Sequence, residues 1–83
     1  MSTTPEVIQA RIAAALPDAQ IAVRDTTGTY DHFDVVVVSP SFTGKMLIDR
    51  HRMVYAALGD AMRAEIHALA LTTLTPAEKE KRR

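Results

Sequence analysis

A strand–helix–strand pattern in the second half of the chain constrains its topology more than any other feature. Residues 33–38 are almost all β-branched or aromatic, residues 46–58 have helical periodicity, and residues 66–71 are again apolar. Apolar residues on both faces of 33–38 favour a central strand that is covered on two sides or lies at an interface. Two strands joined through a helix normally run parallel in one sheet. The pattern therefore predicts a parallel strand pair.

The first residues predict an amphipathic helix. A threonine, a proline and an acid occupy positions 4–6, which is the composition expected where a helix begins. Ile8, Ile12 and Leu16 follow at intervals of four and give one apolar stripe, and Pro17 ends the helix.

A hairpin is expected next. Residues 21–25 alternate apolar and polar, as in a half-buried strand, and residues 26–31 form a loop containing Gly28. In the helix over 46–58, one side at helical spacing carries Leu47, His51, Val54 and Leu58. Gly59 suits the left-handed position that closes this helix, and residues 60–64 can form one further helical turn.

The end of the chain predicts a short final helix. Residues 75–78 satisfy a capping box with a proline at the first helical position. The expected order is α-β-β-α-α-β, a three-stranded mixed sheet with helices on one face. A chain of 83 residues forms one domain, with its core over 5–76 and a frayed basic tail over 77–83.

Composition narrows the function classes. The chain has no cysteine, so it can build neither disulfides nor a cysteine-ligated metal site by itself. Its ten basic residues balance ten acidic ones, so the net charge does not favour binding to nucleic acid. No apolar run approaches the roughly 20 residues of a membrane span, and no leader opens the chain, which predicts a cytoplasmic protein. No nucleophile, phosphate-loop or paired-carboxylate motif indicates an enzyme.

Two histidines are predicted to lie at one edge of the sheet. His32 precedes the second strand and His67 starts the third. Adjacent parallel strands begin at the same edge, about 4.8 Å apart, beside the loop 26–31. Two imidazoles and a polar loop make half of a metal site. The structural alternative, a hydrogen-bonded histidine at a strand start, is the more common role for each residue taken alone. His51 shares its side with apolar residues and is expected to be packed or capping.

The run over 42–71 resembles the core motif of the BolA family. It combines a Gly44-Lys45 helix start, an Arg50-His51-Arg52 step and an apolar strand opened by His67. The strand from His32 to Pro40 resembles the one that precedes this helix in the family. The likeness covers roughly residues 5–76 and implies a KH-like (class II) α+β fold.

The resemblance also implies a function and its ligands. In BolA proteins the histidine at the position of His67 ligates a two-iron two-sulfur cluster shared with a monothiol glutaredoxin and its glutathione. This implies an iron–sulfur trafficking or iron-homeostasis adaptor that replaces one subunit of a glutaredoxin dimer. Many members supply a second ligand from the first hairpin loop. Here Tyr30 stands near that place, and His32 either ligates or only flanks the strand.

The partner surface is expected around this edge. Lys45, Arg50 and Arg52, together with Tyr30, are predicted to contact the glutaredoxin and its carboxylates. The alternative for the basic residues is a solvated helix face. The rival function is a DNA-binding transcriptional regulator, favoured by the basic residues and the basic tail but not by the absent G-x-x-G clamp. An uncovered valine-rich sheet face would also permit a homodimer.

Overall fold

The computed structural model describes residues 4–26, 32–59 and 68–81. In chain order its elements are helix α1 (Pro5–Ala15), strands β1 (Gln20–Asp25) and β2 (His32–Val38), a 3-10 turn (Pro40–Phe42), helix α2 (Leu47–Leu58), strand β3 (Ala68–Leu74) and helix α4 (Pro76–Lys81). This is the predicted α+β arrangement. The predicted turn over 60–64 lies outside the described residues.

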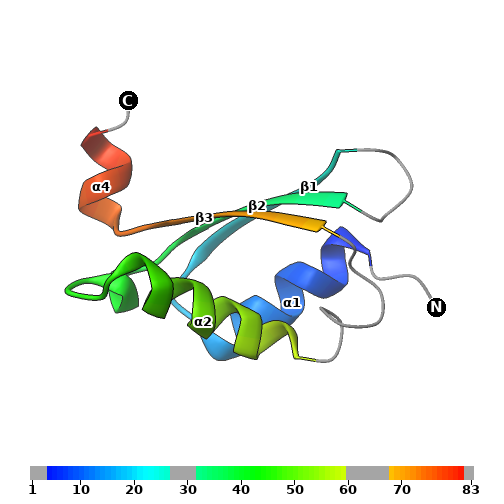
Figure 1. Ribbon diagram of the computed structural model, residues 1–83, viewed down its shortest axis with the longest axis horizontal. Coiled ribbons are helices and arrows are strands. Elements are labelled where there is room, and N and C mark those ends of the chain that lie inside the picture. The colour runs from blue at the N-terminus through cyan, green and yellow to red at the C-terminus, as the bar shows by residue number, and fades with distance from the viewer. Residues whose placement is uncertain (1–3, 27–31, 60–67, 82–83) are drawn as a thin grey trace.

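The sheet is mixed, and β2 is its central strand. β1 pairs with β2 antiparallel, and β3 pairs with β2 parallel. The strand–helix–strand reading is therefore confirmed. Helices α1 and α2 cover one face, whereas α4 stands on the other side, at the end where β3 finishes (Figure 1).

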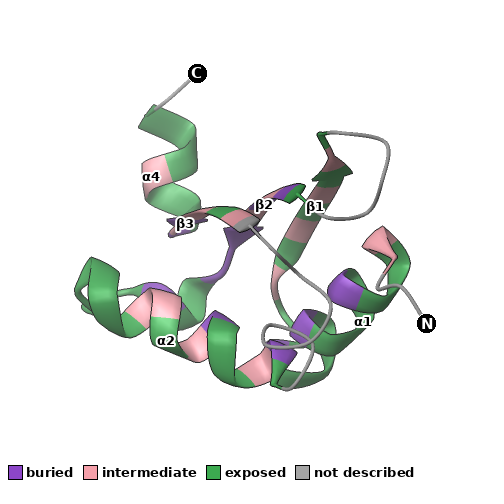
Figure 2. Ribbon diagram, turned by 45° about the vertical axis from the view of Figure 1, so that its right-hand side comes forward, coloured by how far each residue is buried: buried purple, intermediate pink, exposed green. Residues whose placement is uncertain are grey.

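The core lies between the covered face of the sheet and the two long helices. Alternate residues of β2 are buried in it together with residues of α1 and α2, which are purple in Figure 2. Its buried members are Ile8, Ile12, Leu16, Phe33, Val35, Val37, Phe42, Val54 and Leu58. The opposite face of β2 is only half-buried over Asp34 and Val36. Helices therefore cover one face of this strand, and the alternative of a strand covered on both faces is not observed among the described residues.

Local signals place the helix ends as predicted. Thr4 caps α1 by accepting a hydrogen bond from the Val7 amide at 3.3 Å, with Pro5 at the first helical position. Gly59 follows α2 with a φ of 57°, a value that favours glycine. Arg11 of α1 donates to the carbonyl of Leu58 at 3.0 Å, which satisfies one of the free carbonyls at the end of α2.

Several boundaries differ from the sequence predictions. His32 is the first residue of β2 rather than the residue before it, and β3 continues to Leu74, three residues beyond its expected end. The tail is not frayed from residue 77, because α4 continues to Lys81. The ion pair between Glu78 and the distant Arg50 holds this helix in place.

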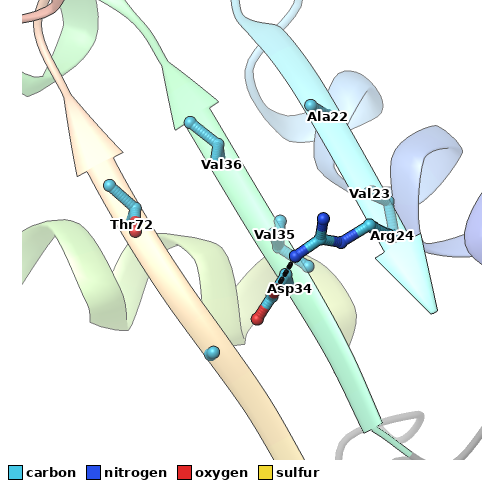
Figure 3. Close-up of a pocket in the computed structure, with 8 residues that line it drawn as sticks. Ala22, Val23, Arg24, Asp34, Val35, Val36 and Thr72 are labelled. Atoms are coloured by element: carbon cyan, nitrogen blue, oxygen red, sulfur yellow. Dashed lines mark hydrogen bonds and ion pairs between the residues drawn. The ribbon is translucent and has the colours of Figure 1, made fainter. Parts of the chain in front are cut away.

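The uncovered face of the sheet is a shallow trough with a volume of about 500 Å³. Its floor is made of small side chains, among them Ala22, Val36 and Thr72, and an ion pair joins Arg24 to Asp34 at 2.7 Å (Figure 3). The side chain of Arg24 is 78% exposed, so water screens this pair strongly. The ion pair therefore lies in a shallow, open part of the described sheet surface.

Candidate functional site

His32 stands at the edge where the two parallel strands begin. It is exposed, and its Cα is paired with that of Ala68, the first residue of β3. It shares the uncovered face of the sheet with Asp34 and Val36, because side chains alternate along a strand. An imidazole in this position is open to solvent and to a docking protein.

The backbone around His32 is held by the start of the hairpin. Both the amide and the hydroxyl of Thr26 donate to the carbonyl of His32, at 3.0 and 3.2 Å. Asp25 is paired with Phe33, one residue further along. The strand therefore fixes the main chain of His32 and leaves its ring outside the core.

His67 and Tyr30 lie outside the described residues. Ala68, which is bonded to His67, is the partner of His32 across the parallel pair. Adjacent Cα atoms are about 3.8 Å apart across a trans peptide. The described residues place His32 and Ala68 side by side at this edge, and the position of His67 beside His32 stays a prediction.

The described part of the chain contains no cluster of three histidine, cysteine, aspartate or glutamate side chains that could hold a metal ion. The third histidine, His51, lies in α2 and stacks edge-on against Tyr55, with ring centroids 6.2 Å apart. Its Nε2 atom is buried without a hydrogen-bond partner among the described residues. This fits the packed role predicted for His51.

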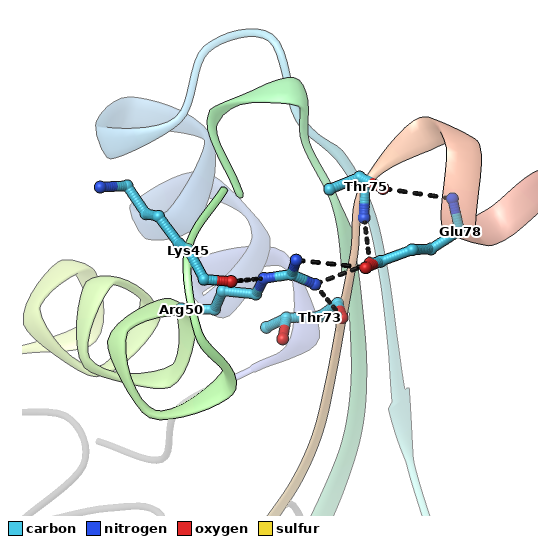
Figure 4. A network of polar contacts seen from close by, with 5 residues as sticks. All are labelled: Lys45, Arg50, Thr73, Thr75 and Glu78. Atoms are coloured by element: carbon cyan, nitrogen blue, oxygen red, sulfur yellow. Dashed lines mark hydrogen bonds and ion pairs between the residues drawn. The ribbon is translucent and has the colours of Figure 1, made fainter. Parts of the chain in front are cut away.

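Arg50 has a different environment from the one the sequence suggested. Its side chain is only 11% exposed, and it forms an ion pair with Glu78 at 2.6 Å. Its guanidinium also donates to the carbonyls of Lys45 at 2.9 Å and Thr73 at 3.4 Å (Figure 4). These bonds favour a structural role for Arg50 over the predicted clamp on a partner.

Glu78 completes this network. Its carboxylate accepts from Arg50 and from the amide of Thr75 at 2.9 Å, while the Thr75 hydroxyl accepts from the amide of Glu78 at 3.1 Å. The predicted capping box is thus present. Hydrogen bonding from Arg50, followed by that from the Thr75 amide, lowers the pKa of Glu78 from 4.5 to about 2.

Lys45 and Arg52 are exposed, but they do not lie beside His32. The first turn of α2 lies near Thr73 and α4, at the end where β3 finishes, whereas His32 and Ala68 mark the other end (Figure 1). The strand between these ends has seven residues, a length of roughly 20 Å. The structure therefore places the first turn of α2 and His32 at opposite ends of this strand and not side by side, and the partner surface itself stays a prediction.

Comparison with known proteins identifies the family. The family model described as BolA-like protein matches residues 6–78. The chain belongs to the BolA-like family. It is similar to the DNA-binding transcriptional regulator BolA of Escherichia coli (strain K12), with 38% identity over 82 residues, covering 90% of this chain and 78% of that protein.

Solved structures of BolA-like proteins have the same fold. A bolA protein homologue from Coxiella burnetii is 38% identical, with a TM-score of 0.78 over 94% of this chain and 97% of that one. Yeast Fra2 is 36% identical, with a TM-score of 0.78 over 98% of this chain and 88% of that one. In some longer relatives the match covers 57% of the protein or less. None of the described helices is long and apolar enough to cross a membrane.

Proposed function

We propose that this BolA-like protein is an adaptor in iron–sulfur cluster trafficking and iron homeostasis. It binds a monothiol glutaredoxin and, through His67, co-ligates a two-iron two-sulfur cluster shared with the glutaredoxin cysteine and glutathione. The observation that carries the proposal is the pairing of exposed His32 with Ala68, the residue next to His67. It supports a site at an open edge that a partner can reach.

The donor chemistry fits a shared cluster better than a resident one. A two-iron two-sulfur cluster takes four protein-side ligands, and imidazoles can replace thiolates on one iron. The chain has no cysteine, so this edge can supply at most two nitrogens, from His67 and His32. The remaining ligands must be thiolates of a partner.

The chain's own residues prepare the edge for this exchange. Thr26 holds the main chain of His32, and the parallel pairing of β2 and β3 fixes the spacing of the two strand starts. A metal-binding imidazole must be neutral, so acid competes with the metal for the ring nitrogen. A cluster bound by imidazoles has a higher reduction potential than one bound by thiolates alone.

Reconstitution with a monothiol glutaredoxin, glutathione, iron and sulfide tests the proposal. The wild-type mixture is expected to give a visible absorption and circular dichroism spectrum distinct from that of the glutaredoxin alone. His67→Ala is expected to abolish that difference, and His32→Ala to alter it if this ring is the second ligand.

The third histidine provides a matched control. His51→Ala removes an imidazole at a site distant from the edge and is expected to leave the spectrum of the mixed complex unchanged. A spectrum indifferent to both His67→Ala and His32→Ala would exclude the ligand assignment. A partner complex that forms only without metal would exclude the shared cluster.

A DNA-binding regulator is the second candidate, favoured by the similarity to the DNA-binding transcriptional regulator BolA of Escherichia coli. Lys45 and Arg52 are exposed and can contact phosphate, whereas Arg50 is engaged within the protein. A titration against duplex DNA at several salt concentrations separates the two functions. DNA binding would be supported by an affinity that falls steeply as the salt concentration rises, and by a shallower fall for Arg52→Ala.

A further inference from the structure

Helix α2 begins with large apolar side chains that the fold leaves exposed. Met46, Leu47 and Ile48 are 73%, 62% and 58% exposed. Together with Tyr55 they line a shallow hollow of about 700 Å³, whose other lining residues are His51 and Arg52. We call these six residues the α2 platform. Single exposed apolar residues are ordinary, but a contiguous group marks an interaction surface.

The platform continues a stripe that is buried further along the helix. Val54 and Leu58 are fully buried in the core, and Leu47 lies seven residues before Val54 on the same side of α2. The sequence therefore predicted Leu47 on the core side of the helix. The structure leaves it exposed, together with Ile48 and Asp49 in the same turn.

The charges around the platform are mainly positive. Lys45 and Arg52 are exposed, and no described residue forms an ion pair with either side chain. Asp49 is the one carboxylate of the first turn. Met46 gives the helix no side-chain cap, so the first amides of α2 add partial positive charge at the same place.

We propose that the α2 platform binds an acidic peptide segment of a partner protein. Large apolar side chains of the segment fill the hollow, and its carboxylates face Lys45, Arg52 and the start of α2. Nucleic acid would match the charges but not the apolar floor. The start of α2, which carries Met46, Leu47 and Ile48, lies at the opposite end of the sheet from His32, so this proposal does not rest on the shared cluster.

A synthetic peptide with leucines at helical spacing and glutamates between them is a direct probe. Binding is measured by fluorescence anisotropy of the labelled peptide and by amide chemical shifts of the isotope-labelled protein. Wild-type protein is expected to bind with shift changes concentrated at residues 45–55. Leu47→Glu is expected to weaken binding about tenfold or more, since it places a like charge on the exposed floor.

Val7→Glu is the matched control, because Val7 is also an exposed apolar residue, 41% accessible, but belongs to α1. It is expected to bind like wild type, as is His32→Ala. Arg52→Ala is expected to weaken binding by a few-fold, and high salt by a similar factor.

Four results would overturn the proposal. They are no binding by wild type, equal binding of a peptide with lysines in place of glutamates, equal loss in Val7→Glu, and shift changes outside the platform. Two further results would assign the surface to another occupant if the peptide does not bind. One is self-association that Leu47→Glu removes, and the other is binding to vesicles of phosphatidylcholine and phosphatidylglycerol that the same substitution removes.

Discussion

The two ends of the sheet differ in how their polar side chains are used. Where β3 finishes, Arg50 and Glu78 are bound to each other and to the main chain of Thr73, Thr75 and Lys45. Where β2 and β3 begin, His32 is exposed, and its carbonyl accepts hydrogen bonds from Thr26. At the first, fastened end an ion pair holds α4 against the fold, whereas at the second, open end the side chain of His32 is exposed.

This difference shows that residue type alone does not mark a functional residue. Arg50 and Arg52 flank the same histidine in sequence, but one is nearly buried and the other is exposed. The comparison predicts that changes at the fastened end alter stability, and that changes at the open end alter binding.

The largest effect is expected for Phe42→Ala. Phe42 is fully buried, and the guanidinium of Arg50 lies 5.9 Å from its ring centroid. Loss of a buried phenylalanine costs about 3–5 kcal/mol of unfolding free energy, measured by urea denaturation. Leu47→Ala is the control, expected within about 0.5 kcal/mol of wild type because the side chain is exposed. Equal costs would contradict the description of the fastened end.

Arg50→Ala is expected to cost less, about 1–3 kcal/mol, because it removes hydrogen bonds to the carbonyls of Lys45 and Thr73 and the contact with Phe42. Arg52→Ala, two residues along the same helix, is expected within about 0.5 kcal/mol of wild type. Denaturation curves of the two variants give a direct comparison. A larger effect for Arg52 would reverse the roles assigned to the two arginines.

The contribution of Glu78 should depend on pH. Its folded-state pKa of about 2 lies below the ordinary 4.5, so its stabilising effect is present above pH 4.5 and is lost as the pH falls toward 2. The stability difference between wild type and Glu78→Gln should therefore shrink over this range. A difference that stayed constant with pH would show that the carboxylate charge is not involved.

The smallest effect on stability is expected at the open end. His32→Ala should change the free energy of unfolding by less than about 0.5 kcal/mol, because the ring is exposed and the bonds from Thr26 are to its carbonyl. Thermal or urea unfolding checks this. A large loss of stability would mean that the side chain of His32 has a structural role.

Much of the architecture could be predicted because its signals are local. The caps of α1 and α4, the glycine after α2 and the parallel β2–β3 pair all follow from residues close in sequence or from chain connectivity. The position of His32 at the edge follows from the same connectivity. His67 and Tyr30 remain predictions, since they lie outside the described residues.

The roles of Arg50 and Leu47 could not be predicted in the same way. Arg50 meets Glu78, 28 residues later in the chain, and helical periodicity gives no sign of that contact. Leu47 has the spacing of a core residue, but its exposure depends on the fold around the first turn of α2.

The sequence by itself determined the order of the elements, the parallel strand pair and the family, because periodicity, caps and motif spacing are written along the chain. Only the tertiary structure decided which basic residue is buried, which apolar residues stay exposed, and that the first turn of α2 and His32 lie at opposite ends of the sheet. Burial and distance depend on contacts between segments far apart in the sequence.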